Sequence, residues 1–467
     1  MGVGVDDGQP VAHDAPPGWV LLASGALLPA DPPRRIVYRL SVHPCIGRDV
    51  PGCRTGRPVG SLPNWGRNGH WMPTIGINFG WRLPDARSGG RAWQADRMRV
   101  VVIGAGIAGA AAAWHLAEHA SVDIIEQEAH PGAHATGRSA ALHTETSGAP
   151  VVSALAAASR PFLAEPPTGF TDHALLSRRG LLWIARAAER HLLEDKAAAA
   201  EAHGVEVHRL DSSQCCDLVG VLHPEAAAGG VHEPGAMNID VDGLLQGFLR
   251  GARHRGAELH VDAGITAVTE RDGGWRVQAG DLHWDCDVVV NAAGAWCDPV
   301  ATLAGIAPLG LRPLRRSVFV FPPPEGVDAL GWPMVWDIGN RFYFEPEGPM
   351  LLVSPVDETP SEPCDARPEV EDIALGVEEL EAATTLQVRG VRRTWAGLRT
   401  FAPDDVPAAG FDPDHPGFFW LAGQGGYGIK TSPALGRLCA ALILDREPPL
   451  QPDDVAALDP ARFRPSS

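Results

Sequence analysis

Apolar residues along this chain fall into strand-like and helix-like runs that begin at residue 99. A run of Val and Ile over 99–103 meets a cluster of glycines and then an Ala-rich segment over 110–119, and a second apolar run covers 122–126. Short apolar runs bounded by turn residues are typical of buried strands, and longer segments with 3.6-residue spacing are typical of helices. The pattern predicts strand, glycine turn, helix and strand in succession.

The same criteria predict the elements that follow. Helices are predicted over 151–165, 187–204, 240–255 and 432–444. Strands are predicted over 180–185, 265–270, 275–279, 282–290, 312–321, 332–336, 341–345, 350–354 and 417–421. Strands of parallel-sheet character lie at both ends of this region and enclose the others, so we expect two interleaved domains with no linker between them.

The glycine turn has the form GxGxxG over Gly104–Gly109 and follows a predicted strand. In a dinucleotide site the first glycine permits the tight turn, the second lets the pyrophosphate approach the backbone, and the third lets the helix pack on the strand. Glu126 ends the second strand 20 residues after Gly106, where an acid accepts hydrogen bonds from the adenosine ribose. The spacing therefore predicts a dinucleotide-binding site.

Two further segments favour a flavin over a nicotinamide. The predicted strand 282–290 runs into the small residues 291–296, which permits a second close approach to a cofactor. The glycine-rich turn 423–428 precedes a helix, and a helix N-terminus stabilises the negative charge that a reduced flavin gains at its N1–O2 edge. A plain strand-to-helix connector is the alternative interpretation of that turn.

Residues 1–97 differ in composition from the remainder. They contain 11 Arg, 7 Asp and 5 Trp, with no Lys and no Glu, and no sustained apolar period. A stretch without an apolar face does not bury a core. We expect the folded protein to start at Met98, with 1–97 either an over-long gene model or a disordered natural extension. Acidic residues precede the apolar run 20–28, so a secretory signal is not expected.

Composition narrows the possible partners and the compartment. Residues 98–467 carry 28 basic and 50 acidic residues, a balance that argues against nucleic acid and anionic membranes. No apolar run is long enough to span a membrane. The six cysteines of this part form no CxxC pair, no disulfide framework and no zinc-ligand pattern, so we expect no metal and a cytoplasmic setting. Neighbouring Cys215 and Cys216 follow a predicted helix cap at Asp211 and are expected to be buried thiols.

Longer stretches resemble the FAD-dependent D-amino acid oxidase superfamily, which includes glycine and sarcosine oxidases, and within it bacterial D-arginine dehydrogenases most closely. The matching segments are 104–109, 136–141, 290–298, 308–311, 395–399 and 424–429. The resemblance covers about 98–445 and implies non-covalent FAD. It implies a Rossmann-like FAD-binding domain (98–180, 230–310 and 400–447) interleaved with a substrate domain on a mixed or antiparallel sheet (180–230 and 310–400).

The resemblance also implies which residues contact FAD. They are Gly104, Gly106, Ile107, Ala108, Gly109, Glu126, Gln127, Arg138, Ser139, Ala140, Ile265, Ala293, Gly294, Trp296, Gly425, Gly426, Tyr427, Gly428, Ile429 and Lys430.

The implied reaction is hydride transfer from the Cα of an amino acid to flavin N5, giving an imine that hydrolyses to a 2-oxo acid and ammonia. It needs an anchored carboxylate and a deprotonated amine, and no metal or nucleophile. By resemblance Arg399 holds the carboxylate, Arg316 and Tyr343 line the same site, and the Gly426 carbonyl accepts from the amine. A structural salt bridge for either arginine, or a core ring for Tyr343, is the alternative.

Departures from the family bear on the substrate. The acid that receives a guanidinium in D-arginine dehydrogenases is replaced here by Leu181, a tyrosine of the lid by Ser147, and a small aliphatic residue by Trp336. A cationic side chain beside Leu181 would lose its charge-assisted hydrogen bonds. We therefore expect a neutral or apolar substrate side chain, unless Glu145 or Asp337 supplies the acid. The predicted substrate pocket comprises His143, Ser147, Leu181, Met334, Trp336 and Lys430.

Lys430 leaves a second possibility open. It is one of two lysines in the chain, and sarcosine oxidases carry a lysine at the equivalent position, where it pairs with the substrate carboxylate. A secondary amine is therefore an alternative substrate. The alternative interpretation of Lys430 itself is a solvated lysine that caps the helix.

A flavin-binding subunit that is inactive by itself is a further alternative for the function of the protein. The electron acceptor (oxygen or a quinone) is not predicted.

Overall fold

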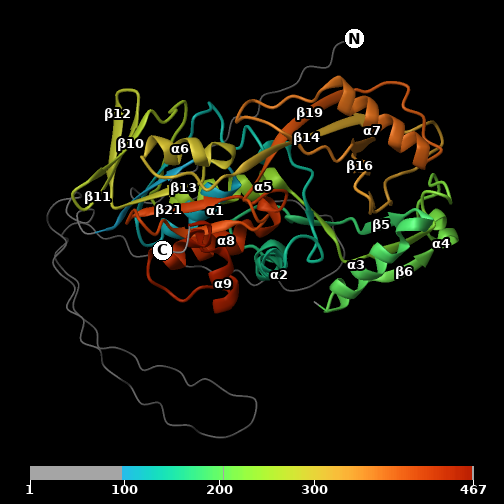
Figure 1. Ribbon diagram of the computed structural model, residues 1–467, viewed down its shortest axis with the longest axis horizontal. Coiled ribbons are helices and arrows are strands. Elements are labelled where there is room, and N and C mark those ends of the chain that lie inside the picture. Colours follow the sequence, from blue (N-terminus) through green and yellow to red (C-terminus); the bar gives the residue numbers. More distant parts are fainter. Residues whose placement is uncertain (1–96, 203, 465–467) are drawn as a thin grey trace, which may run out of the picture. The chain divides into compact units, whose positions relative to one another are not determined.

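The computed structural model describes residues 97–202 and 204–464 (Figure 1). The expectation for the leading segment falls on residues 1–96, outside the described residues. Among those that are described, no helix combines the length and apolar character needed to cross a bilayer. The six cysteines between 215 and 439 are free thiols, and Cys215 is buried in a helix that Asp211 and Gln214 open with a reciprocal capping box.

A six-stranded sheet holds the glycine turn. Its neighbours run parallel except at one edge, where β20 is antiparallel to β21. The strand order is β20 (Ala408–Phe411), β21 (Phe418–Ala422), β13 (Val288–Asn291), β1 (Arg99–Ile103), β2 (Ser121–Ile125) and β9 (Glu258–His260). The central strands are continuously apolar because both of their faces are covered.

Three helices pack together on one face of this sheet: α1 (Ile107–Leu116), α5 (Val241–His254) and α8 (Gly428–Ile443). A Cβ atom at Gly436 would lie 2.8 Å from Ala111 Cβ, so α8 approaches α1 at backbone distance. The helix predicted from 432 begins at Gly428 instead. Pro433 lacks an N–H, and the Ser432 hydroxyl donates to Ile429 O in its place, so the helix continues through the proline.

An antiparallel meander covers the opposite face, formed by β10 (Ala267–Arg271), β11 (Gly274–Ala279) and β12 (Leu282–Cys286). The single strand predicted over 282–290 is wrong, because the chain changes sheets at Asp287. The Asp287 carboxylate accepts from Arg99 N at 2.7 Å and its own N–H donates to Arg99 O. This exchange ends β12 and starts β13 in the parallel sheet.

The second large sheet is mixed and has nine strands (Figure 1). All of its pairs are antiparallel except β5 with β15. Its order is β18 (Thr359–Pro360), β14 (Arg312–Phe321), β17 (Met350–Ser354), β16 (Tyr343–Glu347), β15 (Met334–Asp337), β5 (Leu181–Ala185), β7 (Gly229–Glu233) and β6 (His208–Asp211), with β19 (Arg393–Phe401) paired to β14.

Helices α4 (Ser212–Leu218) and α7 (Val370–Ala383) pack on one face of the mixed sheet, and α3 (Arg190–Ala202) contributes to the core of the other. A small fourth sheet contains β3 (Leu142–His143), β8 (Met237–Ile239) and β4 (Leu176–Arg178), and α2 (Pro150–Ala164) follows β3. Helices α6 (Cys297–Leu303) and α9 (Pro452–Leu458) complete the described α-helices.

The strands of the two large sheets alternate along the chain. The parallel sheet draws on residues 99–125, 258–260, 288–291 and 408–422, and the mixed sheet on 181–233 and 312–401. This arrangement agrees with the predicted fold class. The exact domain boundaries given from the sequence stay a prediction.

Candidate functional site

One cavity is shared by the two large sheets. It is lined by residues that follow β1, β2, β13 and β21 and by residues of β14, β16 and β19. The parallel strands all present their carboxyl ends here, which is where ligands bind in open parallel sheets. The cavity therefore joins the glycine turn at one end to Arg316, Tyr343 and Arg399 at the other.

The glycine turn has the geometry that its spacing predicts. Gly104 has a positive φ of +101°, and a Cβ atom there would lie 2.6 Å from Ala292 O. A Cβ atom on Gly109 would lie 2.0 Å from Gly104 O, so this glycine allows α1 to pack against the turn. Gly106 faces the cavity, and its Cβ would meet only Thr136 Oγ1 at 3.3 Å. The backbone is thus open to a ligand at Gly106.

The N-terminus of α1 is capped from a distant loop. Its own N-cap residue is Gly106, which has no side chain, and Thr136 Oγ1 accepts from Ile107 N at 3.0 Å instead. Glu126 is 7% exposed, and its carboxylate accepts from Ala105 N at 2.8 Å and from Glu128 N at 3.0 Å. Glu126 thereby joins the end of β2 to the glycine turn within the cavity wall.

The second glycine turn closes the other end of the cavity. Gly423 and Gly425 have positive φ values of +72° and +54°, and Tyr427, the N-cap of α8, gives no side-chain cap. The first turn of α8 contains no acidic residue. Its free N–H groups and the positive end of the helix dipole therefore favour a negatively charged or acceptor group beside Gly428 and Ile429, which both line the cavity.

Arg316 enters this end of the cavity from β14 and is 4% exposed. Its Nε donates to Asp357 O and its Nη2 to Glu358 Oε1, both at 2.8 Å, while Nη1 is buried and has no partner among the described residues. Burial lowers the pKa of Arg316 to about 10, and the nearby Arg399 guanidinium adds to that effect.

Arg399 and Tyr343 lie beside it. In the pairing of β14 with β19, Arg316 is opposite Gly397 and Arg399 is opposite Leu314, so the two arginines are diagonal neighbours on adjacent strands. A Cβ atom on Gly426 would lie 3.2 Å from Arg399 Nη1, which places that guanidinium against the second glycine turn. Tyr343 is 2% exposed and lines the same cavity.

Three side-chain donors of the cavity wall lack a partner among the described residues, as does a fourth polar atom, His134 Nδ1. Besides Arg316 Nη1, the Thr400 hydroxyl and the amide nitrogen of Gln424 are buried without a hydrogen bond among the described residues. Each can act as a donor. Orphaned donors that gather in one cavity, between two helix N-termini, fit a ligand rich in acceptors and negative charge.

A comparison with protein families agrees with this geometry. The family described as "DAO: FAD dependent oxidoreductase" matches residues 99–442. The chain belongs to this family. The match confirms the FAD cofactor and the predicted superfamily, whereas a specific kinship with D-arginine dehydrogenases stays a prediction.

The individual relatives that match this chain have low sequence identity to it. Dimethylglycine dehydrogenase of Rattus norvegicus is 25% identical over 397 residues (79% of this chain and 45% of that protein), and sarcosine dehydrogenase of Homo sapiens is 26% identical over 378 residues (75% and 40%). The chain thus spans less than half of the length of either relative. Glycine oxidase from Geobacillus kaustophilus has the same fold, with a TM-score of 0.68, 23% identity and coverage of 77% of this chain and 98% of that one. These matches confirm the predicted fold class.

Most residues predicted to contact FAD line the cavity of this FAD-dependent oxidoreductase family member. Gly109, Tyr427 and Lys430 are the exceptions, outside the lining. Those in the lining are Gly104, Gly106, Ile107, Ala108, Glu126, Gln127, Arg138, Ser139, Ala140, Ile265, Ala293, Gly294, Trp296, Gly425, Gly426, Gly428 and Ile429. Their individual contacts with FAD stay a prediction.

Arg138 has a structural task in addition to any contact with FAD. Its Nη1 donates to Ala366 O at 2.8 Å and to Ala396 O at 2.9 Å, and its Nη2 pairs with Asp365. It therefore fastens the loop after the cap residue Thr136 to β19 of the mixed sheet.

The residues predicted as a substrate pocket do not line the cavity. Leu181 and Met334 are 1% and 2% exposed and pair across β5 and β15 in the core of the mixed sheet. Trp336 approaches the cavity indirectly, through Tyr343. His143 is buried with its Nε2 3.2 Å from Ala156 O of α2, and burial lowers its pKa.

Ser147 and Lys430 contact each other. Lys430 Nζ donates to Ser147 Oγ at 2.9 Å, to Ser147 O at 3.0 Å and to Thr144 O at 2.8 Å. Lys430 is 4% exposed, and burial lowers its pKa to about 7. The alternative interpretation of Lys430 as a solvated helix cap is wrong, because its ammonium group is buried against a loop.

The two acids considered as replacements for the one missing at Leu181 are already paired. Asp337 binds Arg341 at 2.6 Å, and Glu145 binds Arg160 at 2.9 Å. A third acid, Glu233, was not predicted, because no local pattern marks it. Its backbone lies directly opposite Leu181 on β7, and it is 3% exposed.

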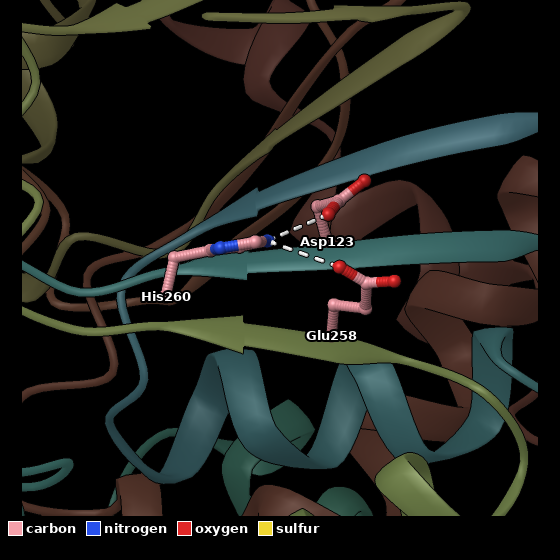
Figure 2. A group of neighbouring side chains, drawn as sticks. All are labelled: Asp123, Glu258 and His260. Atoms are coloured by element: carbon pink, nitrogen blue, oxygen red, sulfur yellow. Dashed lines mark hydrogen bonds and ion pairs between the residues drawn. The ribbon is translucent and has the colours of Figure 1, made fainter. Parts of the chain in front are cut away.

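One group of side chains among residues 97–464 has ligand atoms within 4.8 Å of one another: Asp123, Glu258 and His260 (Figure 2). His260 Nε2 lies 2.8 Å from Asp123 Oδ1 and 3.9 Å from Glu258 Oε2, on the neighbouring strands β2 and β9. These contacts tie an edge strand to the parallel sheet. None of the three side chains belongs to the cavity lining.

Proposed function

We propose that this protein is an FAD-dependent enzyme that oxidises the Cα–N bond of a small amino acid with a neutral side chain, with a D-amino acid as the leading substrate. The proposal rests on Arg316 and Arg399, which lie at the end of the cavity beside the second glycine turn. Two guanidinium groups on adjacent strands repel each other, and Arg316 Nη1 is a buried donor with no partner in the part of the chain that the structure describes. A substrate carboxylate between them relieves both costs.

The residues of the site then have distinct tasks. Arg399 and Arg316 hold the carboxylate, and the ring of Tyr343 closes the wall beside it. The carbonyl of Gly426 accepts a hydrogen bond from the amine, which orients the nitrogen and the Cα–H bond. When bound, FAD supplies a two-electron acceptor that takes the hydride from Cα, and the imine left behind adds water and releases ammonia and a 2-oxo acid.

A secondary amine is the second candidate substrate. The name of one relative supports it, since sarcosine is a secondary amine, and dimethylglycine, named for another relative, is the corresponding tertiary amine. The same carboxylate anchor serves either substrate, and the size of the space around the nitrogen decides between them.

The test is anaerobic reduction of the purified, FAD-loaded protein by a panel of D-, L- and N-methyl amino acids. We expect bleaching of the flavin absorbance by small neutral D-amino acids. Faster bleaching by sarcosine or proline would select the second candidate. Failure of every member of the panel to bleach the flavin would overturn the proposal.

A further inference from the structure

A short loop connects β3 to α2 and is held by side chains of α8 and β7. We call residues 144–148 the strap. Lys430 of α8 binds the strap carbonyls of Thr144 and Ser147 and the Ser147 hydroxyl, at 2.8 to 3.0 Å. An ammonium group has three N–H donors, so these contacts use all of them. Lys430 has no donor left for a substrate carboxylate.

Glu233, on strand β7 of the mixed sheet, forms hydrogen bonds with the strap. One oxygen of its carboxylate accepts from the hydroxyl of Thr144 at 2.8 Å and from that of Thr146 at 2.7 Å. Thr146 N in turn donates to Thr144 Oγ1 at 3.2 Å. Glu233 is 3% exposed, and burial raises its pKa. The buried carboxylate and the buried ammonium therefore bind the same loop.

The contacts of Lys430 connect two segments of the cavity wall. The strap follows Ser139 and Ala140, which line the cavity, and Lys430 follows Gly428 and Ile429, which line it as well. Fixing the strap to the first turn of α8 thus fixes these two wall segments relative to each other.

We infer that Lys430 is a positioning residue, which clamps the strap to α8 and leaves the substrate carboxylate to Arg316 and Arg399. The inference rests on the proposed function for the role of the arginines. It differs from the interpretation of Lys430 as a carboxylate ligand, and the two make opposite predictions for ligand binding and for the mobility of the strap.

The first measurement is hydrogen exchange of the FAD-loaded full chain, read by mass spectrometry in peptides that cover 142–150. In Lys430→Met, we expect the strap amides to exchange at least about tenfold faster, because its fastening is lost. Lys196→Met is the matched control, since Lys196 is the only other lysine, its charge also acts on Glu233, and among the described residues it makes no hydrogen bond to the strap. Unchanged exchange in Lys430→Met would overturn the inference.

The second measurement is a titration with acetate, a carboxylate without a side chain, followed by the flavin absorbance. We expect the acetate Kd of Lys430→Met to stay within about threefold of the wild type and that of Arg399→Met to rise by about 30-fold or more. The reverse pattern would overturn the inference. If neither variant changes the acetate Kd while the strap loosens in Lys430→Met, the clamp stands and the proposed carboxylate anchor fails.

A third variant distinguishes loss of the strap contacts from misfolding of Lys430→Met. Lys430→Gln retains two N–H donors and is expected to restore most of the strap protection that Lys430→Met loses. In the background of Lys430→Met, adding Ser147→Ala should change the exchange no further, because the shared contact is already gone. Full additivity of the two substitutions would contradict the clamp.

Discussion

The ring of Trp336 stacks on the ring of Tyr343, with centroids 4.7 Å apart and an interplanar angle of 25°. Tyr343 lines the cavity, and Trp336 supports it from the neighbouring strand β15. A second indole, that of Trp183, lies 5.4 Å beyond Trp336. Three aromatic rings in a row thus support the cavity wall at Tyr343, and under the proposed function we expect this wall to favour small substrates.

Replacing this support should widen the range of substrates. In Trp336→Val, we expect the ratio of kcat/KM for D-leucine to that for D-alanine to rise by about tenfold, since a few methylene groups of added space carry that much discrimination. The ratio is measured from anaerobic flavin reduction with each amino acid. An unchanged ratio would show that the indole does not limit the side chain.

Gly109 provides a test of the glycine turn. A Cβ atom there would lie 2.0 Å from Gly104 O, so Gly109→Ala forces α1 away from the turn. We expect a loss of about 1–3 kcal/mol in the free energy of unfolding and a lower FAD content per chain. Gly331→Ala is the control, because a Cβ at Gly331 meets no atom within 4 Å. Equal Tm and FAD content in the two variants would contradict the assigned role.

Local patterns predicted much of this arrangement. The roles of Gly104 and Gly109 depend on backbone geometry within a few residues, and their spacing alone was informative. The roles predicted for Arg316 and Arg399 came from the family resemblance, because no local pattern marks an arginine on a strand as a residue that binds substrate. Contacts between distant segments gave no signal: Thr136 caps a helix that begins 29 residues earlier, and Glu233 lies 89 residues from Thr144. The residues predicted to form a substrate pocket around Leu181 lie outside the cavity lining, and their contact with substrate stays a prediction.

Glu345 predicts a pH dependence of stability. Burial raises its pKa from 4.5 to about 7, although Arg179 lies 3.5 Å away and opposes the shift. Between about pH 4.5 and 7 the folded chain holds a proton that the unfolded chain has released, so the free energy of unfolding falls as the pH rises through this window. The stabilising contribution is fully present only below pH 4.5.

The comparison is between the wild type and Glu345→Gln, which cannot titrate. Relative to this variant, the wild type should lose up to about 3 kcal/mol of stability between pH 5 and pH 8. Denaturant unfolding at each pH measures the difference. Parallel stability curves over this range would show that Glu345 titrates at its ordinary pKa.

The account depends most on the claim that Arg316 and Arg399 anchor a carboxylate beside FAD. The most direct measurement compares the anaerobic flavin reduction rate for the fastest amino acid of the panel with the rate for its carboxamide, which keeps the amine and side chain. We predict that the acid reduces the flavin at least about 100-fold faster at equal concentration, because the neutral amide gives Arg399 and the unpartnered Nη1 of Arg316 no negative charge to bind. Equal rates for the acid and the amide would contradict the central claim.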